Sequence, residues 1–253
     1  MATKTAAMVV IGDEILSGRI QDLNAHHLAG RMAALGIPLI EIRTVPDDHG
    51  AIAAAIRALS GSLGGTADYL FTSGGIGPTH DDITADAVAA AHGVPIDVRE
   101  DARALLLARY GADGINAARL RMARIPQGAA LIDNPVSAAP GFRIGSTHVM
   151  AGVPEVFRAM LAGIEPSLTG GPPIRAHGFE VAVAEGDLAA DLAALDAAHP
   201  TVSVGCYPYW REGPSARVVL RAADPAALAA AATAARALLE THAPGAVQET
   251  PPP

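Results

Sequence analysis

The chain has 253 residues, half of them hydrophobic, with a formal net charge of −8 and one cysteine, Cys206. This length suits one large domain or a medium domain followed by a small one. The acidic balance, without any basic stretch, argues against nucleic acid as a partner. Charges interrupt every apolar segment before the roughly 20 residues of a membrane span, so we expect no membrane partner. A single cysteine rules out an internal disulfide framework and predicts a reducing, cytoplasmic compartment.

The first half of the chain alternates between predicted strands and helices. The opening residues, MATKTAAMVVIGDE, are typical of a first strand and not of a signal peptide. The predicted order is strand 6–12, helix 22–36, strand 38–45, helix 48–60, strand 67–72 and helix 83–92. This rhythm predicts an α/β fold of three layers, with a mainly parallel sheet and helices on both faces.

The pattern in the second half of the chain predicts a further, smaller domain. Helices are expected at 99–111 and 116–122, an irregular Pro-rich segment at 130–144, and then a strand, a turn and a helix starting near Pro154. TGGPPIR, residues 169–175, is the best linker candidate. After it we expect a small α+β domain: strand 176–184, helix 187–198, strands 201–207 and 215–222, and helix 225–241. The predicted domains are 1–168 and 175–243, followed by a flexible tail at 244–253.

The chain has one lysine, Lys4, at its N-terminal end. A P-loop needs a lysine beside its glycines, and pyridoxal chemistry needs a Schiff-base lysine. Both classes are therefore excluded. Any bound phosphate must be held by arginine, by backbone N–H groups, by a helix N-terminus or by a metal.

Carboxylates follow each of the first three predicted strands. The segments are GDEIL (12–16), VPDDHG (45–50) and SGGIGPTHDD (73–82). Ligands of parallel sheets bind beyond the carboxyl ends of the strands, so we expect the three segments to share one site. The glycines in the third segment allow backbone N–H groups to approach an anion closely; they are Gly74, Gly75 and Gly77.

A purely structural interpretation is a tight turn with Asp82 as the N-cap of the next helix, as Asp48 would cap the helix after the second strand. It leaves Asp81 and Asp47 unexplained, because one cap needs one carboxylate. Paired carboxylates beside a phosphate-binding loop favour a hard divalent cation, Mg²⁺ or another, with Asp82, Asp81 and Asp47 as ligands. Such an ion would neutralise a polyphosphate and orient the attacking oxygen.

Five motifs resemble one known family in collinear order over residues 5 to about 165. They are GDEILSGRIQDLNAHHLAGRMAALGI, VPDD, SGGIGPTHDDIT, NPVSAAPGF and AGVPEVFRAM. They resemble the molybdopterin-binding fold family, with the N-terminal domains of competence/damage-inducible protein A and of FAD synthase as the most similar branch. The second domain, with VSVGCYPYWRE, also resembles the small domain that follows in this branch.

The resemblance implies a site for a small pterin or nucleotide substrate, and a homo-oligomer. It implies catalytic roles for Asp47 and Asp82, with Asp81 beside them. The implied substrate- or phosphate-binding residues lie in the same motifs: Gly74, Gly75, Gly77, Pro78, Thr79, Asp13, Glu14, Asn24, Pro140, Gly141, Gly152 and Pro154.

Three functions stay open at this point. Asp81 stands where the molybdopterin adenylyltransferases usually carry arginine, which disfavours that activity. The double aspartate instead resembles the branch that cleaves phosphoanhydrides in ADP-ribose- or FAD-like dinucleotides, and this is the leading hypothesis. A pterin- or nucleotide-binding protein without catalysis is the alternative from another class.

Overall fold

The computed structural model describes residues 3–250, which form two compact units. The first unit holds the chain up to residue 171, apart from the short stretch 33–36, and the second begins at residue 172. This boundary lies inside the segment 169–175 that we predicted as a linker.

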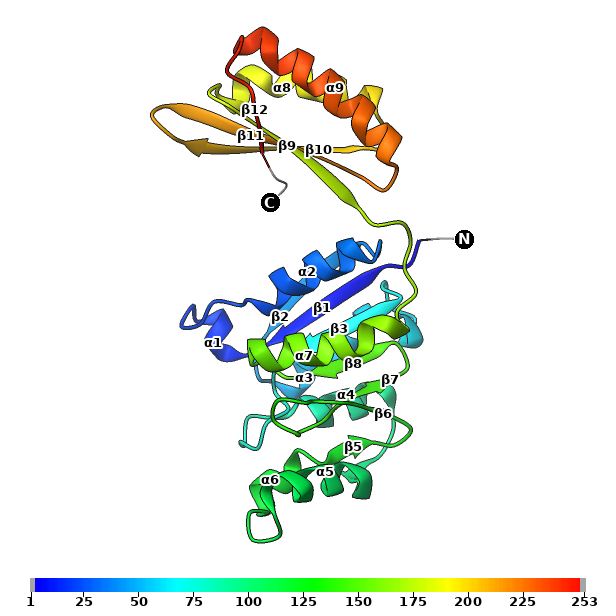
Figure 1. The fold of residues 1–253 in the computed structure, drawn as a ribbon. Helices are drawn as coiled ribbons and strands as arrows, with labels where there is room; N and C mark the ends of the chain where they lie inside the picture. The colour runs from blue at the N-terminus through cyan, green and yellow to red at the C-terminus, as the bar shows by residue number, and fades with distance from the viewer. Residues whose placement is uncertain (1–2, 251–253) are drawn as a thin grey trace. The chain divides into compact units, whose positions relative to one another are not determined.

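The first unit is built on a six-stranded sheet with the order β2-β1-β3-β8-β7-β6 (Figure 1). Strands β2, β1, β3 and β8 run parallel, and β7 and β6 continue the sheet in antiparallel pairing. The predicted, mainly parallel sheet is therefore confirmed. The six strands are β1 Ala6–Ile11, β2 Leu39–Val45, β3 Tyr69–Ser73, β6 Ala130–Ile132, β7 Gly141–Ile144 and β8 Thr147–Met150.

Helices cover both faces of this sheet. Strand β1 is buried along its whole length, because successive side chains point to opposite faces and both faces are covered. Ala7, Val9 and Ile11 share one core with α3 and α4, whereas α2 and α7 lie on the other face (Figure 1). The helices of this unit are α1 Asp13–Leu16, α2 Asn24–Ala34, α3 His49–Leu59, α4 Thr84–His92, α5 Glu100–Tyr110, α6 Ala117–Arg121 and α7 Pro154–Ile164, with single 3₁₀ turns η1 at Gly61–Leu63 and η2 at Glu165–Ser167.

Two predicted helix starts are confirmed. The Asp48 carboxylate accepts a hydrogen bond from the N–H of Ala51 at 2.8 Å and so caps α3. Pro154 occupies the first turn of α7, where its missing N–H costs nothing.

The prediction of an irregular segment over 130–144 is wrong at both ends, where β6 and β7 pair with each other. A small separate sheet was also missed, in which β4 Ile96–Val98 pairs antiparallel with β5 Arg124–Pro126. These strands have only three or four residues. So few positions cannot show the alternation that identifies a strand in a sequence.

The second unit is a four-stranded antiparallel sheet with the order β10-β11-β9-β12. Its strands are β9 Arg175–Val181, β10 Ser203–Trp210, β11 Pro214–Ala222 and β12 Gln248–Thr250, and its helices are α8 Glu185–Ala198 and α9 Pro225–His242. Both helices contribute to one core with the sheet. The half-buried thiol of Cys206 packs against this core, and burial raises its pKa, which disfavours a nucleophilic role.

The prediction of a flexible tail over 244–253 is wrong at residues 248–250. These residues form β12 and pair with β9. Glu249 forms an ion pair with Arg236 of α9 at 2.7 Å, which connects β12 to this helix as well as to β9. The pattern QET offers no apolar alternation, so pairing partners and not hydrophobicity place this strand. Residues 251–253 lie outside the described part of the chain.

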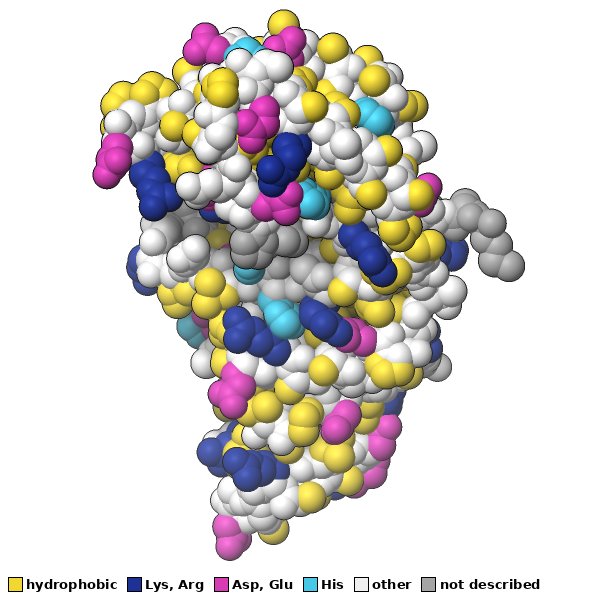
Figure 2. Space-filling model, turned by 45° about the horizontal axis from the view of Figure 1, so that its top comes forward, with side chains coloured by type: hydrophobic (Ala, Val, Ile, Leu, Met, Phe, Trp, Pro, Cys, Tyr) yellow, Lys and Arg dark blue, Asp and Glu magenta, His cyan; other side chains and the backbone are white. Residues whose placement is uncertain are grey.

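The surface carries both signs of charge. On the face that Figure 2 shows, Lys and Arg side chains lie interspersed with Asp and Glu. None of the helices within residues 3–250 combines the length and the apolar character needed to cross a membrane.

A buried histidine should make the first unit sensitive to acid. His148 of β8 is 3% exposed and stacks on Phe71 with ring centroids 5.1 Å apart. Burial, helped by the charge of Arg143, lowers its pKa from 6.5 to about 4. Between pH 6.5 and about 4, His148 is protonated in the unfolded chain but stays neutral in the folded unit. The free energy of unfolding therefore falls as the pH is lowered, by about 3 kcal/mol once the pH reaches the folded-state pKa.

This prediction is checked by urea unfolding at a series of pH values between neutral and about 4. His148→Leu should flatten the acid limb of the stability curve. His80→Gln is the matched control, because the His80 side chain is 98% exposed and its loss should leave the curve unchanged. An acid limb that persists undiminished in His148→Leu would contradict this assignment.

Candidate functional site

The carboxyl ends of β1, β2 and β3 meet at one edge of the sheet, as predicted. In register, Val10 of β1 lies between Thr44 of β2 and Ser73 of β3. The turns that follow these strands border a cavity of about 690 Å³. This volume falls within the range of small-molecule sites. Its lining includes Gly12 and Glu14 after β1, Asp47 after β2, and Gly74, Gly75, Gly77, Pro78, Asp81 and Asp82 after β3.

The loop after β3 takes a conformation that requires glycine. Gly74 and Gly75 have φ values of +110° and +69°. A Cβ atom on Gly74 would lie 2.3 Å from the carbonyl oxygen of Ile11, and one on Gly75 would lie 2.1 Å from Oγ1 of Thr84. Thr84 holds the loop by donating its hydroxyl to Gly74 O at 3.0 Å and its N–H to Gly75 O at 3.0 Å. The loop is thus folded tightly onto the start of α4.

The three glycines of this loop differ in what they offer an anion. The N–H of Gly74 donates to Met150 O at 3.2 Å, so this predicted phosphate donor is already engaged. The N–H groups of Gly75, Ile76 and Gly77 donate to no other residue within 3–250. Backbone donors for an anion therefore come from residues 75–77, and Ile76 joins the set that the sequence suggested.

Asp82 does not cap α4, contrary to the structural interpretation. Ile83 is the N-cap residue, and no side chain caps this helix. Instead, Asp82 Oδ2 accepts hydrogen bonds from the N–H of Thr79 at 2.7 Å and from its hydroxyl. Thr79 therefore orients Asp82 and does not line the cavity, although we predicted it as a substrate contact.

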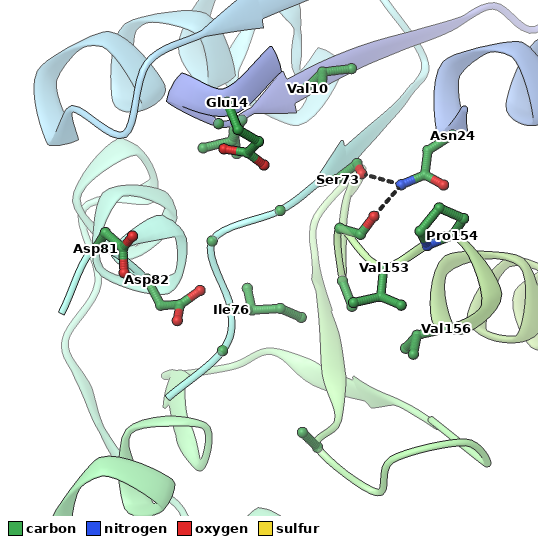
Figure 3. Close-up of a pocket in the computed structure, with 18 of the residues that line it drawn as sticks. Val10, Glu14, Asn24, Ser73, Ile76, Asp81, Asp82, Val153, Pro154 and Val156 are labelled. Atoms are coloured by element: carbon green, nitrogen blue, oxygen red, sulfur yellow. Dashed lines mark hydrogen bonds between the residues drawn. The ribbon is translucent and has the colours of Figure 1, made fainter. Parts of the chain in front are cut away.

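Asp47 lies near three other carboxylates, those of Glu14, Asp13 and Asp81. Its Oδ2 accepts a hydrogen bond from the N–H of Asp13 at 3.0 Å. Burial raises the pKa of Asp47, the Asp13 N–H opposes this, and the charges of Glu14, Asp13 and Asp81 raise it further. Glu14 and Asp82 turn their carboxylates toward the glycine loop (Figure 3). This edge of the cavity therefore has an excess of negative charge that a cation would relieve.

The carboxylates do not form a cage for a metal by themselves. In the described chain, residues 3–250, no group of three or more His, Cys, Asp or Glu side chains is close enough to hold an ion. Mg²⁺ commonly binds through one or two carboxylates, waters and substrate phosphates. Asp47, Asp81 and Asp82, which line the cavity, fit that mode, in which the substrate completes the coordination.

Asn24 is a buried polar residue of the cavity wall, as are Ser73 and Asn134. Asn24 is 3% exposed, and its Nδ2 donates to Ser73 Oγ and to Gly152 O, both at 2.7 Å (Figure 3). These bonds join α2 to the end of β3 and to the turn before α7. The amide orientation is fixed, because a reversed amide would place two carbonyl oxygens together.

Replacing Asn24 should loosen these connections. Asn24→Ala leaves Gly152 O without its buried donor and should cost about 2 kcal/mol of folding stability. Asn24→Asp keeps the shape but sets a carboxylate against Gly152 O, so its cost should be at least as large. Urea unfolding measures both. If neither variant lost stability, the two hydrogen bonds would have no structural role.

Several predicted residues lie beside the cavity and not in it. Asp13 contributes its N–H to Asp47, but its side chain does not line the cavity. Pro140 borders a separate small recess with Arg121. Gly141 is buried in β7, where a Cβ atom would lie 2.3 Å from Val149 O. Of the other residues predicted to bind the substrate, Glu14, Asn24, Gly152 and Pro154 line the cavity together with the loop residues already named.

One part of the cavity lining was not predicted from the sequence. Tyr110 of α5, with Arg119 and Met122 from the region of α6, faces the cavity, as do Asn134 and Ser137 of the segment between β6 and β7. A signal was present in the sequence. Since Lys4 at the N-terminal end is the chain's one lysine, the arginines of AARLRMAR were the natural candidates for contact with an anionic ligand.

Comparisons with known proteins agree with this architecture. A family model described as "Probable molybdopterin binding domain" matches residues 7–170, and one described as "FAD synthase, middle domain" matches residues 173–247. The chain is similar to a "CinA-like protein" of Citrifermentans bemidjiense, with 40% identity over 171 residues, 65% of this chain and 40% of the relative. It is also similar to a "CinA-like protein" of Myxococcus xanthus, with 32% identity over 257 residues, 92% of this chain and 59% of the relative. The chain therefore spans only part of the length of these relatives.

Among solved structures, the chain is similar to "the protein CinA with unknown function" from Thermoplasma acidophilum. The TM-score is 0.60 with 32% identity, and the match covers 65% of this chain and 98% of that chain. The two segments matched by the family models, 7–170 and 173–247, follow the two compact units closely.

Proposed function

This chain belongs to the probable molybdopterin-binding domain family, and we propose that its first unit is a metal-dependent hydrolase. The bond cleaved is a phosphoanhydride in a nucleotide-containing substrate such as ADP-ribose or FAD. Water adds to one phosphorus, the bridging oxygen leaves, and two phosphomonoesters result.

The observation that carries this proposal is that backbone donors suited to phosphate and a group of carboxylates lie in the same cavity. The free N–H groups of residues 75–77 suit phosphate oxygens. Asp47, Asp81 and Asp82 line the same cavity and would repel those oxygens. A divalent cation, when bound between them, would neutralise this repulsion and lower the pKa of the attacking water.

Side chains of the protein would accept the proton of the attacking water and orient the reacting groups. Asp47 is the proposed proton acceptor, because it lines the cavity and the N–H of Asp13 orients its carboxylate at 3.0 Å. Thr79 holds Asp82 in one orientation through two hydrogen bonds. The glycine loop, fixed by Thr84, would place the phosphate between these carboxylates.

Two other functions use the same cavity. A molybdopterin adenylyltransferase would form a phosphoanhydride with ATP instead of cleaving one, and a binding protein would hold its ligand unchanged. Asp81 disfavours adenylyl transfer, because it stands where the molybdopterin adenylyltransferases that this chain resembles usually carry arginine.

The test is a turnover assay with ADP-ribose and FAD, each with Mg²⁺ or Mn²⁺ and with a chelator. Hydrolysis that requires the divalent ion supports the proposal. Tight binding of these compounds without turnover would favour the binding protein. ATP-dependent adenylylation of molybdopterin would favour the transferase.

A further inference from the structure

The part of the cavity lining formed by Tyr110, Arg119 and Met122 has a chemistry that the hydrolysis itself does not use. We propose that Arg119, stacked on Tyr110, is a platform that binds the planar heteroaromatic ring of the substrate and so determines specificity. This inference rests on the proposed function, since it assigns the ring of a nucleotide whose phosphates lie at the glycine loop.

The guanidinium of Arg119 is held in place. Its Cζ lies 4.5 Å from the centroid of the Tyr110 ring, and its Nη1 donates to Gly114 O. An arginine stacked by one face on an aromatic ring keeps its second face for another planar group. Both residues line the cavity, with the apolar Met122 beside them.

The distribution of charge in the cavity favours Arg119 as the contact for a ring that carries phosphates. The acidic residues that line the cavity are Glu14, Asp22, Asp47, Asp81 and Asp82. Of the lysines and arginines in the described chain, Arg119 alone lines the cavity. A ring that carries phosphates would thus meet a fixed cation at one wall while its phosphates reach the donors of residues 75–77.

The platform is connected to the glycine loop. Arg121, two residues after Arg119 on α6, donates its Nη2 to Asp82 O at 3.2 Å. This bond connects α6 to the segment that carries the proposed metal ligands. A ring at Arg119 and a phosphate at residues 75–77 would lie in the same cavity, which suits substrates in which a ring and a phosphate are linked.

An apolar rim elsewhere on the cavity is the competing location for a ring. Ile20, Leu23 and Val153 line the cavity and are 57%, 44% and 60% exposed. They offer contact area but no planar group and no positive charge. We therefore assign the ring to Arg119 and keep the rim as an outcome of the test.

The test compares AMP with ribose 5-phosphate, which differ by the base alone and contain no bond for the enzyme to cleave. Calorimetric titration in Mg²⁺ should show that the wild type binds AMP more tightly. Arg119→Ala should weaken AMP about tenfold and leave ribose 5-phosphate unchanged. Arg119→Lys keeps the charge but not the planar face, and should weaken AMP in the same direction.

A matched control makes the result specific. Arg109→Ala removes one positive charge from α5 at an exposed position outside the cavity, and should bind AMP as the wild type does.

Three results would overturn the inference. Equal weakening of both probes in Arg119→Ala would make Arg119 a phosphate contact. A base preference that survives Arg119→Ala and Arg119→Lys but is lost in Ile20→Ser would place the ring at the apolar rim. Failure of the wild type to bind either probe, with Mg²⁺ or without, would reject the proposed function together with this platform.

Discussion

Asp82→Asn is expected to lower kcat for phosphoanhydride hydrolysis by at least about a hundredfold while the fold is retained. Asp82 Oδ2 accepts two hydrogen bonds from Thr79, and an amide oxygen can accept the same pair. The substitution therefore keeps the loop geometry and removes only the negative charge. Steady-state kinetics at saturating Mg²⁺, with thermal unfolding as the folding check, measures the effect.

Two further variants separate charge from position. Thr79→Val removes the hydroxyl bond to Asp82 but keeps the charge, so we expect a smaller loss of kcat, about tenfold. Asp133→Asn removes a charge from an exposed position outside the cavity lining and should have wild-type kinetics. Unchanged turnover in Asp82→Asn would reduce Asp82 to a structural residue of the loop.

Gly75→Ala should have the second largest effect, on both stability and activity. At a φ of +69° an alanine is strained, and its Cβ would lie 2.1 Å from the Thr84 hydroxyl oxygen. Thr84 is fully buried, so its side chain has little room to move, and turning it breaks the hydrogen bond to Gly74 O. Strain and overpacking together should cost about 3 kcal/mol.

Gly93→Ala is the matched control for this substitution. Gly93 ends the same helix, α4, with a φ of +67°, but an added Cβ meets nothing within 4 Å. It should cost only about 1 kcal/mol, the price of the left-handed backbone alone. Urea unfolding of the two variants isolates the contact with Thr84. Equal losses would show that backbone conformation, and not close packing, requires the glycine.

The central layers of the fold could be predicted because each element was long enough to show its period. AAMVVI reads as a buried strand, and it is buried on both faces. The cap at Asp48 and the helix start at Pro154 were also readable, because both depend on neighbours within three residues. The strands β6, β7 and β12 have only three or four residues, too few to show an alternation, and β12 also depends on β9, a partner distant in the sequence.

The candidate site, like the fold, was predictable only in part. That three strand ends would share one edge follows from parallel topology, and Glu14, Asp47 and Asp82 do line one cavity. Whether Asp82 caps the next helix could not be decided from the sequence, because a helix start and a tight turn both favour aspartate and only the structure shows Thr79 as its donor. Arg119 was missed because α5 and α6 lie outside the sheet, and a sequence does not show which helix face closes a distant cavity.

The most direct test of hydrolysis at this site is ³¹P nuclear magnetic resonance of ADP-ribose with the wild-type protein and Mg²⁺ in ¹⁸O-labelled water. The two coupled phosphoanhydride signals should disappear, and AMP and ribose 5-phosphate should appear in equal amounts. One ¹⁸O atom per bond cleaved should be found on a product phosphate, and none of this should occur with a chelator or with Asp82→Asn. Intact ADP-ribose and FAD after prolonged incubation, under conditions in which AMP binding by the same sample is demonstrated, would contradict hydrolysis at this site.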